Sequence, residues 1–314
     1  MLKNLRICNI CCNFAARMAK IGVFDSGYGG LTILNAIRRR LPEYDYLYLG
    51  DNARAPYGTH SFDVIYRYTL QAVQYLLEHD CALVILACNT ASAKALRTIQ
   101  QHDLPQINRS IVNRQTVQSS IVNRPIVNVL GVIRPTVEAV PAITKTGHVG
   151  ILATPATVSS ESYVLELEKM SNQLLITQQA CPMWVPLIEA GEHQNAGADY
   201  FVDSYLRQIL SKDSQIDTLV LGCTHYPLLL PKIEKWIEKN MPSGGSKLSV
   251  IAQGGLVADS LADYLRRHPE YRDQLSRGGT CGYLTTENAD RFSQSASVFC
   301  ASPIQATHID LGTN

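Results

Sequence analysis

The sequence predicts an α/β protein in two halves of similar plan, each built on a mainly parallel sheet. Three observations support this prediction. Short apolar runs with strand character alternate with amphipathic segments of helical length along most of the 314 residues. Turns rich in glycine, proline and small polar residues separate them, as in βαβ units. The alternation then starts again in the second half of the chain, near Val149.

The first elements of the chain follow this plan closely. We expect a strand over residues 20–24, a turn over 25–30 and a helix over 31–41. Three arginines at 38–40 favour the helix, because cations complement the negative end of the helix dipole. Pro42 then ends it. A second strand, a loop, a long helix and a third strand are expected over residues 44–49, 51–60, 61–78 and 83–87.

The segment over residues 106–124 interrupts the alternation. It carries Ile-Asn-Arg at 107–109 and Ile-Val-Asn-Arg at both 111–114 and 121–124, a repeat too short to build a solenoid. We expect an exposed loop inserted into the first domain. A partner-binding surface is the alternative, since long loops are often functional.

The second half repeats the plan with different residues. Strands and helices are expected over residues 126–130, 149–153, 158–170, 174–178, 200–210 and from 218 onward. A tail adds a strand over 249–252, a helix over 257–267, and strands near Cys281 and Val298. We therefore expect a first α/β domain over residues 20–125, a second over 126–248, and a return segment over 249–314 that completes the first.

Residues 1–19 are expected to form a disordered N-terminal extension. Two alternatives are a signal peptide, although Asn9 interrupts the apolar stretch, and half of a zinc site at Cys8 and Cys11. The chain has no second CxxC or CxxH pair to complete such a site. Met18 is an alternative natural start, because the strand pattern begins directly after it.

Composition restricts the class of protein. The chain is 46% hydrophobic and 18% charged with a net charge of +1, the profile of a globular protein without a nucleic-acid footprint. No apolar run reaches the length of a membrane span. Nine cysteines at irregular spacing argue against a disulfide framework and favour a reducing cytoplasm. We expect neither a nucleic acid nor a membrane as a partner.

Two cysteine motifs carry the chemistry. One reads Ala-Cys-Asn-Thr-Ala-Ser at residues 87–92, and the other Leu-Gly-Cys-Thr-His-Tyr-Pro at 221–227. Each follows a buried strand, at the sheet edge where open α/β sheets bind ligands. Cys88 and Cys223 could simply be core residues. Their polar neighbours would however need partners in a core. Two facing thiols could remove a proton from one side of a carbon atom and return one to the other.

Other polar residues are expected at the same edge. The turn Asp-Ser-Gly-Tyr-Gly-Gly at 25–30 presents backbone amides near a helix N-terminus and suits a carboxylate, the alternative being a tight turn capped by Asp25. The Pro-Tyr-Gly turn at 56–58 carries little information alone. His225 supplies a general acid–base group. Glu189 could orient His225, bind a substrate ammonium, or simply end a solvated helix.

With these residues in place, the chain resembles the glutamate racemases, cofactor-independent enzymes that make D-glutamate for the bacterial cell wall. The matching stretches are residues 21–32, 51–58, 88–92, 131–135, 154–163 and 221–227. They cover most of the chain outside the extension and the segment 106–124. Chemistry agrees, because a proton next to a carboxylate is weakly acidic and its carbanion needs preorganised hydrogen bonds.

The resemblance implies two domains facing each other across a cleft that holds the active site. It implies that Cys88 and Cys223 act on opposite faces of the substrate α-carbon, Asp25 assisting the first thiol and Glu189 and His225 lying near the second. The implied substrate contacts are Asp25, Ser26, Tyr57, Gly58, Asn89, Thr90, Thr154, Thr224 and His225. It further implies no cofactor or metal, a homodimer, a cytoplasmic location and a role in peptidoglycan synthesis.

Two alternatives stay open. An aspartate or hydantoin racemase of the same superfamily would share the paired cysteines with a different pocket. A non-catalytic binding protein could keep the fold and use the insertion as a partner surface. The chain departs from the family pattern at residues 252–255, Ala-Gln-Gly-Gly, where an acidic residue is more usual, and we expect that segment to touch no catalytic position. Cys81, Cys181, Cys281 and Cys300 are expected to be structural.

Overall fold

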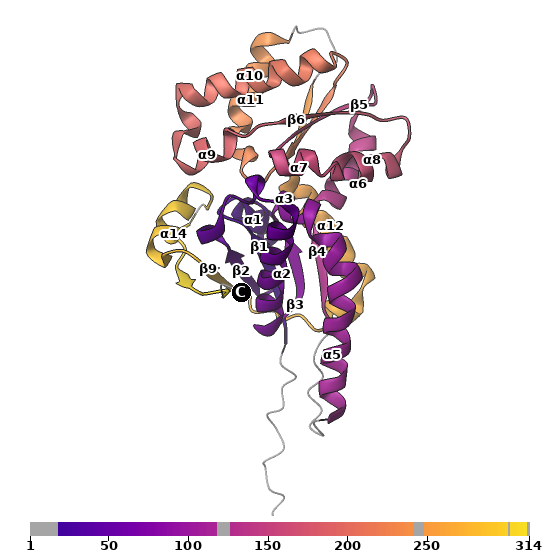
Figure 1. Ribbon diagram of the computed structural model, residues 1–314, viewed down its shortest axis with the longest axis vertical. Coiled ribbons are helices and arrows are strands. Elements are labelled where there is room, and N and C mark those ends of the chain that lie inside the picture. The colour runs from indigo at the N-terminus through magenta and orange to yellow at the C-terminus, as the bar shows by residue number, and fades with distance from the viewer. Residues whose placement is uncertain (1–17, 118–125, 242–247, 301, 313–314) are drawn as a thin grey trace, which may run out of the picture.

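The computed structural model describes residues 18–117, 126–241, 248–300 and 302–312. Two lobes lie one above the other in Figure 1, and each is built on its own sheet. We call them the first domain, with the six-stranded sheet, and the second domain, with the four-stranded sheet. Every strand pairing in both sheets is parallel, so the predicted α/β class is confirmed.

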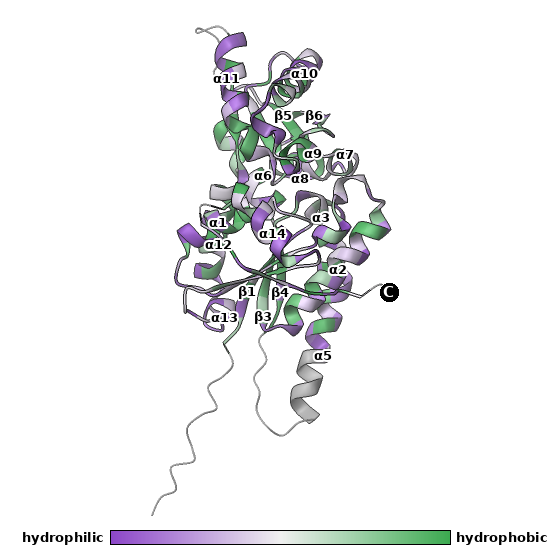
Figure 2. Ribbon diagram, turned by 90° about the vertical axis from the view of Figure 1, so that its left-hand side faces the viewer, coloured by the Kyte–Doolittle hydropathy of each residue, from purple (hydrophilic) through white to green (hydrophobic). Residues whose placement is uncertain are grey.

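The six strands of the first domain have the order β10-β9-β2-β1-β3-β4. Their bounds are β1 (Lys20–Asp25), β2 (Tyr46–Gly50), β3 (Cys81–Leu86), β4 (Asn128–Gly131), β9 (Cys281–Thr285) and β10 (Ala306–His308). Every residue of β2 and β3 is buried, because a parallel sheet is covered by helices on both faces. Figure 2 shows hydrophobic residues along β3 and β4 and hydrophilic ones on outer helices such as α11 (Leu230–Asn240).

The second domain holds the strand order β6-β5-β7-β8. Its strands are β5 (His148–Ala153), β6 (Leu175–Ala180), β7 (Thr218–Gly222) and β8 (Ser249–Ile251). The longer helices are α1 (Gly30–Arg40), α2 (Phe62–Glu78), α5 (Leu104–Val117), α6 (Ile133–Ile143), α8 (Ser162–Met170), α10 (Ala196–Lys212) and α12 (Gln253–Arg267). The shorter ones are α3 (Asn89–Lys94), α4 (Leu96–Thr98), α7 (Pro155–Ser159), α9 (Trp184–Glu189), α13 (Pro269–Arg272) and α14 (Ala289–Ser295).

Single turns of other helix types complete the chain. They are the 3₁₀ turns η1 (Asn52–Arg54), η2 (Tyr57–Thr59), η4 (Glu192–Gln194), η5 (Tyr226–Leu229) and η6 (Ala296–Val298), and the π-helical turn η3 (Ile99–Asp103). Within the parts of the chain that the structure describes, none of the helices combines the length and apolarity that a membrane crossing requires.

The two sheets place the domain crossings differently from the prediction. The strand β4, expected to open the second domain, pairs with β3 in the first sheet, and Val129 packs in the same core cluster as Val84. The strand β8, expected to begin the return segment, pairs with β7, and its Ile251 packs with Val220. The chain therefore crosses to the second domain after β4 and returns to the first after β8. Each of these short strands belongs to the sheet whose core its apolar side chain joins.

The predicted loop over residues 106–124 is wrong for its first part. Residues 104–117 form the helix α5, which continues directly from η3 and so needs no new nucleation. Leu104 is buried, and Ile107, three residues later on the same face, packs against the core. The rest of the segment lies outside the described residues. In both Figure 1 and Figure 2, α5 points away from the second domain.

The strand expected near Val298 is wrong, because Ala296–Val298 form η6, and Ala296 and Phe299, three residues apart, both pack into the core. The helix expected over 158–170 is interrupted at Glu161, which has the left-handed φ of 52°. The predictions for the N-terminal extension, including a zinc pair at Cys8 and Cys11, fall on residues outside the described part.

Candidate active site

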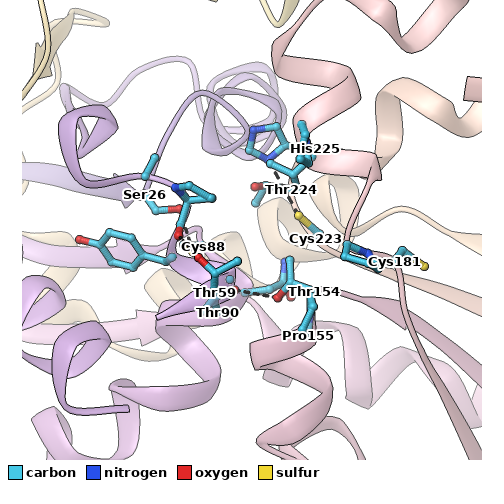
Figure 3. Close-up of a pocket in the computed structure, with 18 of the residues that line it drawn as sticks. Ser26, Thr59, Cys88, Thr90, Thr154, Pro155, Cys181, Cys223, Thr224 and His225 are labelled. Atoms are coloured by element: carbon cyan, nitrogen blue, oxygen red, sulfur yellow. Dashed lines mark hydrogen bonds between the residues drawn. The ribbon is translucent and has the colours of Figure 1, made fainter. Parts of the chain in front are cut away.

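One pocket between the two domains contains most of the predicted site residues. Its lining includes Ser26, Tyr57, Gly58, Cys88, Asn89, Thr90, Thr154, Glu189, Cys223, Thr224 and His225. Cys88 and Cys223 both face this pocket, one from each domain (Figure 3). The carboxyl ends of parallel strands in both sheets therefore meet here, as open α/β sheets predict.

Cys88 lies where β3 turns into α3. As the N-cap residue of α3 it accepts a hydrogen bond from the Ala91 amide, with an N–Sγ distance of 3.5 Å. The hydroxyl of Ser26 lies 3.4 Å from the same sulfur (Figure 3). Burial, followed by the negative charge of Asp25, raises the pKa of Cys88 to about 12. This thiol is therefore protonated at neutral pH in the ligand-free protein.

Asp25 is fully buried and lies behind the pocket lining rather than on it. Its Oδ2 accepts a hydrogen bond from the Gly27 amide at 3.0 Å, and its Oδ1 lies 3.5 Å from the hydroxyl oxygen of Thr224 in the second domain. Burial raises the pKa of Asp25, and the positive charge of His225 partly opposes this rise. Asp25 is therefore placed to influence the groups that line the pocket, and its expected substrate contact stays a prediction.

Two glycines allow this close approach. A Cβ atom at Gly29 would lie 2.3 Å from the Thr224 hydroxyl oxygen, and one at Gly30 would lie 2.4 Å from the Cβ of Asp25. Both distances are shorter than side chains tolerate. A larger residue at Gly29 would push the βα turn away from the second domain, and one at Gly30 would displace Asp25 within the first.

Cys223 has different neighbours from Cys88. It follows β7 directly, and its sulfur lies 3.9 Å from Nδ1 of His225. The other ring nitrogen, Nε2, is 3.0 Å from Oε1 of Glu189, the last residue of α9. Burial alone would lower the pKa of His225, but its interactions with Cys223 and Glu189 raise it to about 10. A protonated imidazole therefore lies beside the second sulfur.

Hydroxyl groups join the domains between the two sulfurs. Oγ1 of Thr90 lies 3.0 Å from Oγ1 of Thr154 (Figure 3). It also lies 3.3 Å from Oγ1 of Thr157. Thr154 is the N-cap residue of α7. A Cβ at Gly58 would lie 3.0 Å from the Cβ of Thr154, so the pocket is tightly closed at this point. The phenol of Tyr57 donates a hydrogen bond to buried Asp51.

Sequence reasoning missed Cys181, which lines the pocket although it was expected to be merely structural. It is buried and follows β6 directly, near the same sheet edge as the cysteines after β3 and β7. The motif rule passed over it because Pro182 and Met183, the next two residues, carry no polar side chain. Its thiol lies 3.6 Å from the carbonyl oxygen of Gln179.

Residues 252–255, which depart from the family pattern, reach the wall of the pocket through an expected substrate contact. Oε1 of Gln253 accepts a hydrogen bond of 2.6 Å from Nδ2 of Asn89, which lines the pocket. The sequence offered no signal for this contact, because it joins residues far apart along the chain.

The groups around the pocket are arranged for proton transfer to and from a bound molecule. A molecule held in the pocket would lie between two sulfurs, one beside a buried carboxylate and the other beside an imidazolium–carboxylate pair. Hydroxyl and amide groups of Ser26, Asn89, Thr90 and Thr224 line the same space and could bind an anionic group. Such a site can move protons to and from opposite faces of one carbon atom.

Comparison with known proteins assigns a family to this architecture. The model of the Asp/Glu/Hydantoin racemase family matches residues 31–252. The chain is 40% identical to a glutamate racemase of Ruegeria sp. over 289 residues, which covers 89% of this chain and 96% of the relative.

Solved structures agree. A glutamate racemase from Bacillus anthracis, 29% identical, superposes with a TM-score of 0.75 and covers 93% of this chain and 98% of its own. A glutamate racemase from Francisella tularensis, solved with D-glutamate, is 28% identical and has a TM-score of 0.73, with 94% of this chain and 99% of that chain covered.

Proposed function

Since this chain belongs to the Asp/Glu/Hydantoin racemase family and is an amino-acid racemase, we propose that it interconverts L- and D-glutamate with Cys88 and Cys223 as its two proton-transferring groups. One observation carries the mechanism: the two cysteines come from different domains and line a single pocket.

The reaction needs two groups in opposite protonation states. In one direction, the thiolate of one cysteine removes the α-proton of glutamate, and the thiol of the other cysteine donates its proton to the opposite face of the carbon. The product has inverted configuration, and the two sulfurs have exchanged protonation states. Catalysis in the other direction begins from that exchanged state, so no proton is gained or lost in either direction.

Different groups adjust the two sulfurs for these steps. His225 supplies positive charge beside Cys223, and Glu189 holds the imidazole through Nε2. Cys88 is protonated in the empty site, because burial and the nearby negative charge of Asp25 both raise its pKa. We assign Asp25, Glu189 and His225 to proton transfer and charge balance.

The substrate carboxylate is the group whose charge grows as the α-proton leaves. Donors that already point into a water-poor pocket stabilise this charge without reorganisation. Ser26, Asn89, Thr90 and Thr224 provide such donors, with Tyr57, Gly58 and Thr154 completing the walls. This support for the carbanion is the reason that the proposed reaction proceeds without pyridoxal phosphate or another cofactor.

The proposed physiological role follows from the product. D-glutamate is a building block of peptidoglycan, so we propose that the enzyme acts in the cytoplasm and supports cell-wall synthesis and cell shape. Six cysteines of the described residues are free thiols, which suits a reducing compartment. We propose a homodimer as the working assembly.

The test is racemisation by the purified chain without added cofactor. Incubation with L-glutamate should produce D-glutamate until the two are equal, as measured by chiral chromatography. Aspartate and a hydantoin serve as competing substrates, and faster turnover of either would assign a different substrate. The matched control is Cys300→Ala, which removes a cysteine outside the pocket lining. It should leave the rate of racemisation unchanged.

A further inference from the structure

A closed ring of three hydrogen bonds lies behind the pocket wall. Tyr163 donates its hydroxyl proton to Oδ1 of Asn89 at 2.7 Å, and Nδ2 of Asn89 donates to Oε1 of Gln253 at 2.6 Å. Nε2 of Gln253 then donates to the Tyr163 hydroxyl oxygen at 2.8 Å, which closes the ring. All three side chains are at least 98% buried, so none of these groups can exchange its partner for bulk water.

The ring joins elements from both domains. Asn89 is the first residue of α3 in the first domain, and Tyr163 lies on α8 in the second. Gln253 begins α12 at the point where the chain returns from the second sheet. Of the three, Asn89 lines the pocket, next to Cys88.

A residue outside the ring, Thr136, determines which group donates and which accepts in each hydrogen bond of the ring. The Thr136 hydroxyl donates to the carbonyl of Val132 at 3.0 Å, so its oxygen is left to accept. Nε2 of Gln253 lies 2.9 Å from that oxygen and must be the donor. The amide of Gln253 consequently presents Oε1 to Asn89, and Asn89 must present its NH₂ group in return.

The Tyr163 hydroxyl completes this orientation. Burial raises the pKa of Tyr163, so its phenol keeps its proton at neutral pH. That proton goes to Oδ1 of Asn89 because the phenol oxygen already accepts from Gln253. The carboxamide of Asn89 is therefore held at both ends, and one N–H of Nδ2 is left for a group in the pocket.

We propose that Gln253 is a positioning residue for racemisation, which fixes the Asn89 carboxamide so that its free N–H meets the substrate. The proposal rests on the proposed function and deepens it. Without Gln253, the amide of Asn89 could turn over and present an oxygen to an anionic substrate. Gln253 acts through Asn89 and touches no substrate itself.

A double-mutant cycle tests this directly. Gln253→Leu should lower kcat/KM for glutamate by roughly 10- to 100-fold, since it leaves buried groups unpaired and releases Asn89. In an Asn89→Ala background the same change should cost less than about 2-fold, because the group that Gln253 orients has gone. Gln179→Leu is the matched control. Gln179 is another buried glutamine with a paired amide, but it lies off the pocket lining, and its effect should be the same in both backgrounds.

A second variant separates orientation from folding. Gln253→Glu keeps the size of the side chain and an oxygen that accepts from Asn89. It loses the amide NH₂ group that donates hydrogen bonds to the hydroxyl oxygens of Tyr163 and Thr136. We expect reduced activity that recovers as pH falls and the buried carboxyl regains a proton. Circular dichroism and urea midpoints establish which variants fold, and this variant replaces Gln253→Leu if that one does not.

The outcomes are distinguishable. An equal loss from Gln253→Leu with and without Asn89, or full activity of a folded Gln253→Leu protein, would overturn the positioning role. A wild-type chain that does not racemise glutamate would instead reject the proposed function, before any variant is compared.

Discussion

The two sulfurs of the pocket sit at matching places in the two domains but in opposite electrostatic surroundings. Cys88 follows β3, accepts a hydrogen bond from the Ala91 amide and lies near the buried carboxylate of Asp25. Cys223 follows β7 and lies beside His225, which Glu189 contacts. Similar backbones can thus place similar proton-transferring groups, while a few neighbouring side chains decide how each one holds its proton.

This contrast matters because a two-sided reaction cannot begin with both sulfurs in the same protonation state. Burial and a nearby negative charge keep Cys88 protonated, whereas positive charge lies beside Cys223. The empty site is therefore already asymmetric.

Removing either sulfur should abolish racemisation but leave half of the chemistry. Cys88→Ala and Cys223→Ala should each lose more than about 1,000-fold in racemisation, since one face of the α-carbon then lacks its acid or base. Each variant should still exchange the α-hydrogen of one enantiomer with deuterated water, and the two variants should prefer opposite enantiomers. Proton NMR of each enantiomer measures this. Exchange of the same enantiomer by both variants would contradict two-sided geometry.

Removing the charged group beside one sulfur should make proton transfer to or from that sulfur rate-limiting. His225→Asn and Asp25→Asn should each lower kcat/KM by on the order of 100-fold, equally in both directions because the equilibrium constant is one. The α-deuterium isotope effect should rise for the enantiomer that gives its proton to Cys223 in His225→Asn, and for the other enantiomer in Asp25→Asn. A rise for the same enantiomer in both variants would remove the assignment of each group to one sulfur.

The smallest effect concerns stability. The folded-state pKa of His225, about 10, lies above its ordinary value of 6.5. Protonated His225 therefore stabilises the folded state fully below about pH 6.5, and this contribution is lost as pH rises through about 10. The free energy of unfolding in urea should exceed that of His225→Asn at pH 6, and the gap should narrow toward pH 10. A constant gap would show that His225 is not held protonated.

Much of this molecule could be predicted from local patterns. The strands before Cys88 and Cys223 are continuous apolar runs, and the arginines near the end of α1 complement its dipole, so these elements are found near their expected positions. The pocket residues follow, because they stand at the carboxyl ends of those strands.

The misplaced strands and the missed ring share a physical cause. Whether β4 or β8 belongs to one sheet or the other depends on which neighbour it pairs with across the fold, and no local pattern encodes that choice. The ring through Gln253 depends on the same long-range packing. The helix α5 was missed for a different reason, since its polar repeat resembles a loop while two apolar residues anchor it.

The hydroxyl contacts between Thr90 and Thr154 have a consequence for product escape. Separation of the two domains at this point, which would open the pocket for a product to leave, would break neutral hydrogen bonds, each worth about 1 kcal/mol net. Water would replace them on both sides. Because these contacts carry no net charge, the cost of opening here should depend little on salt concentration.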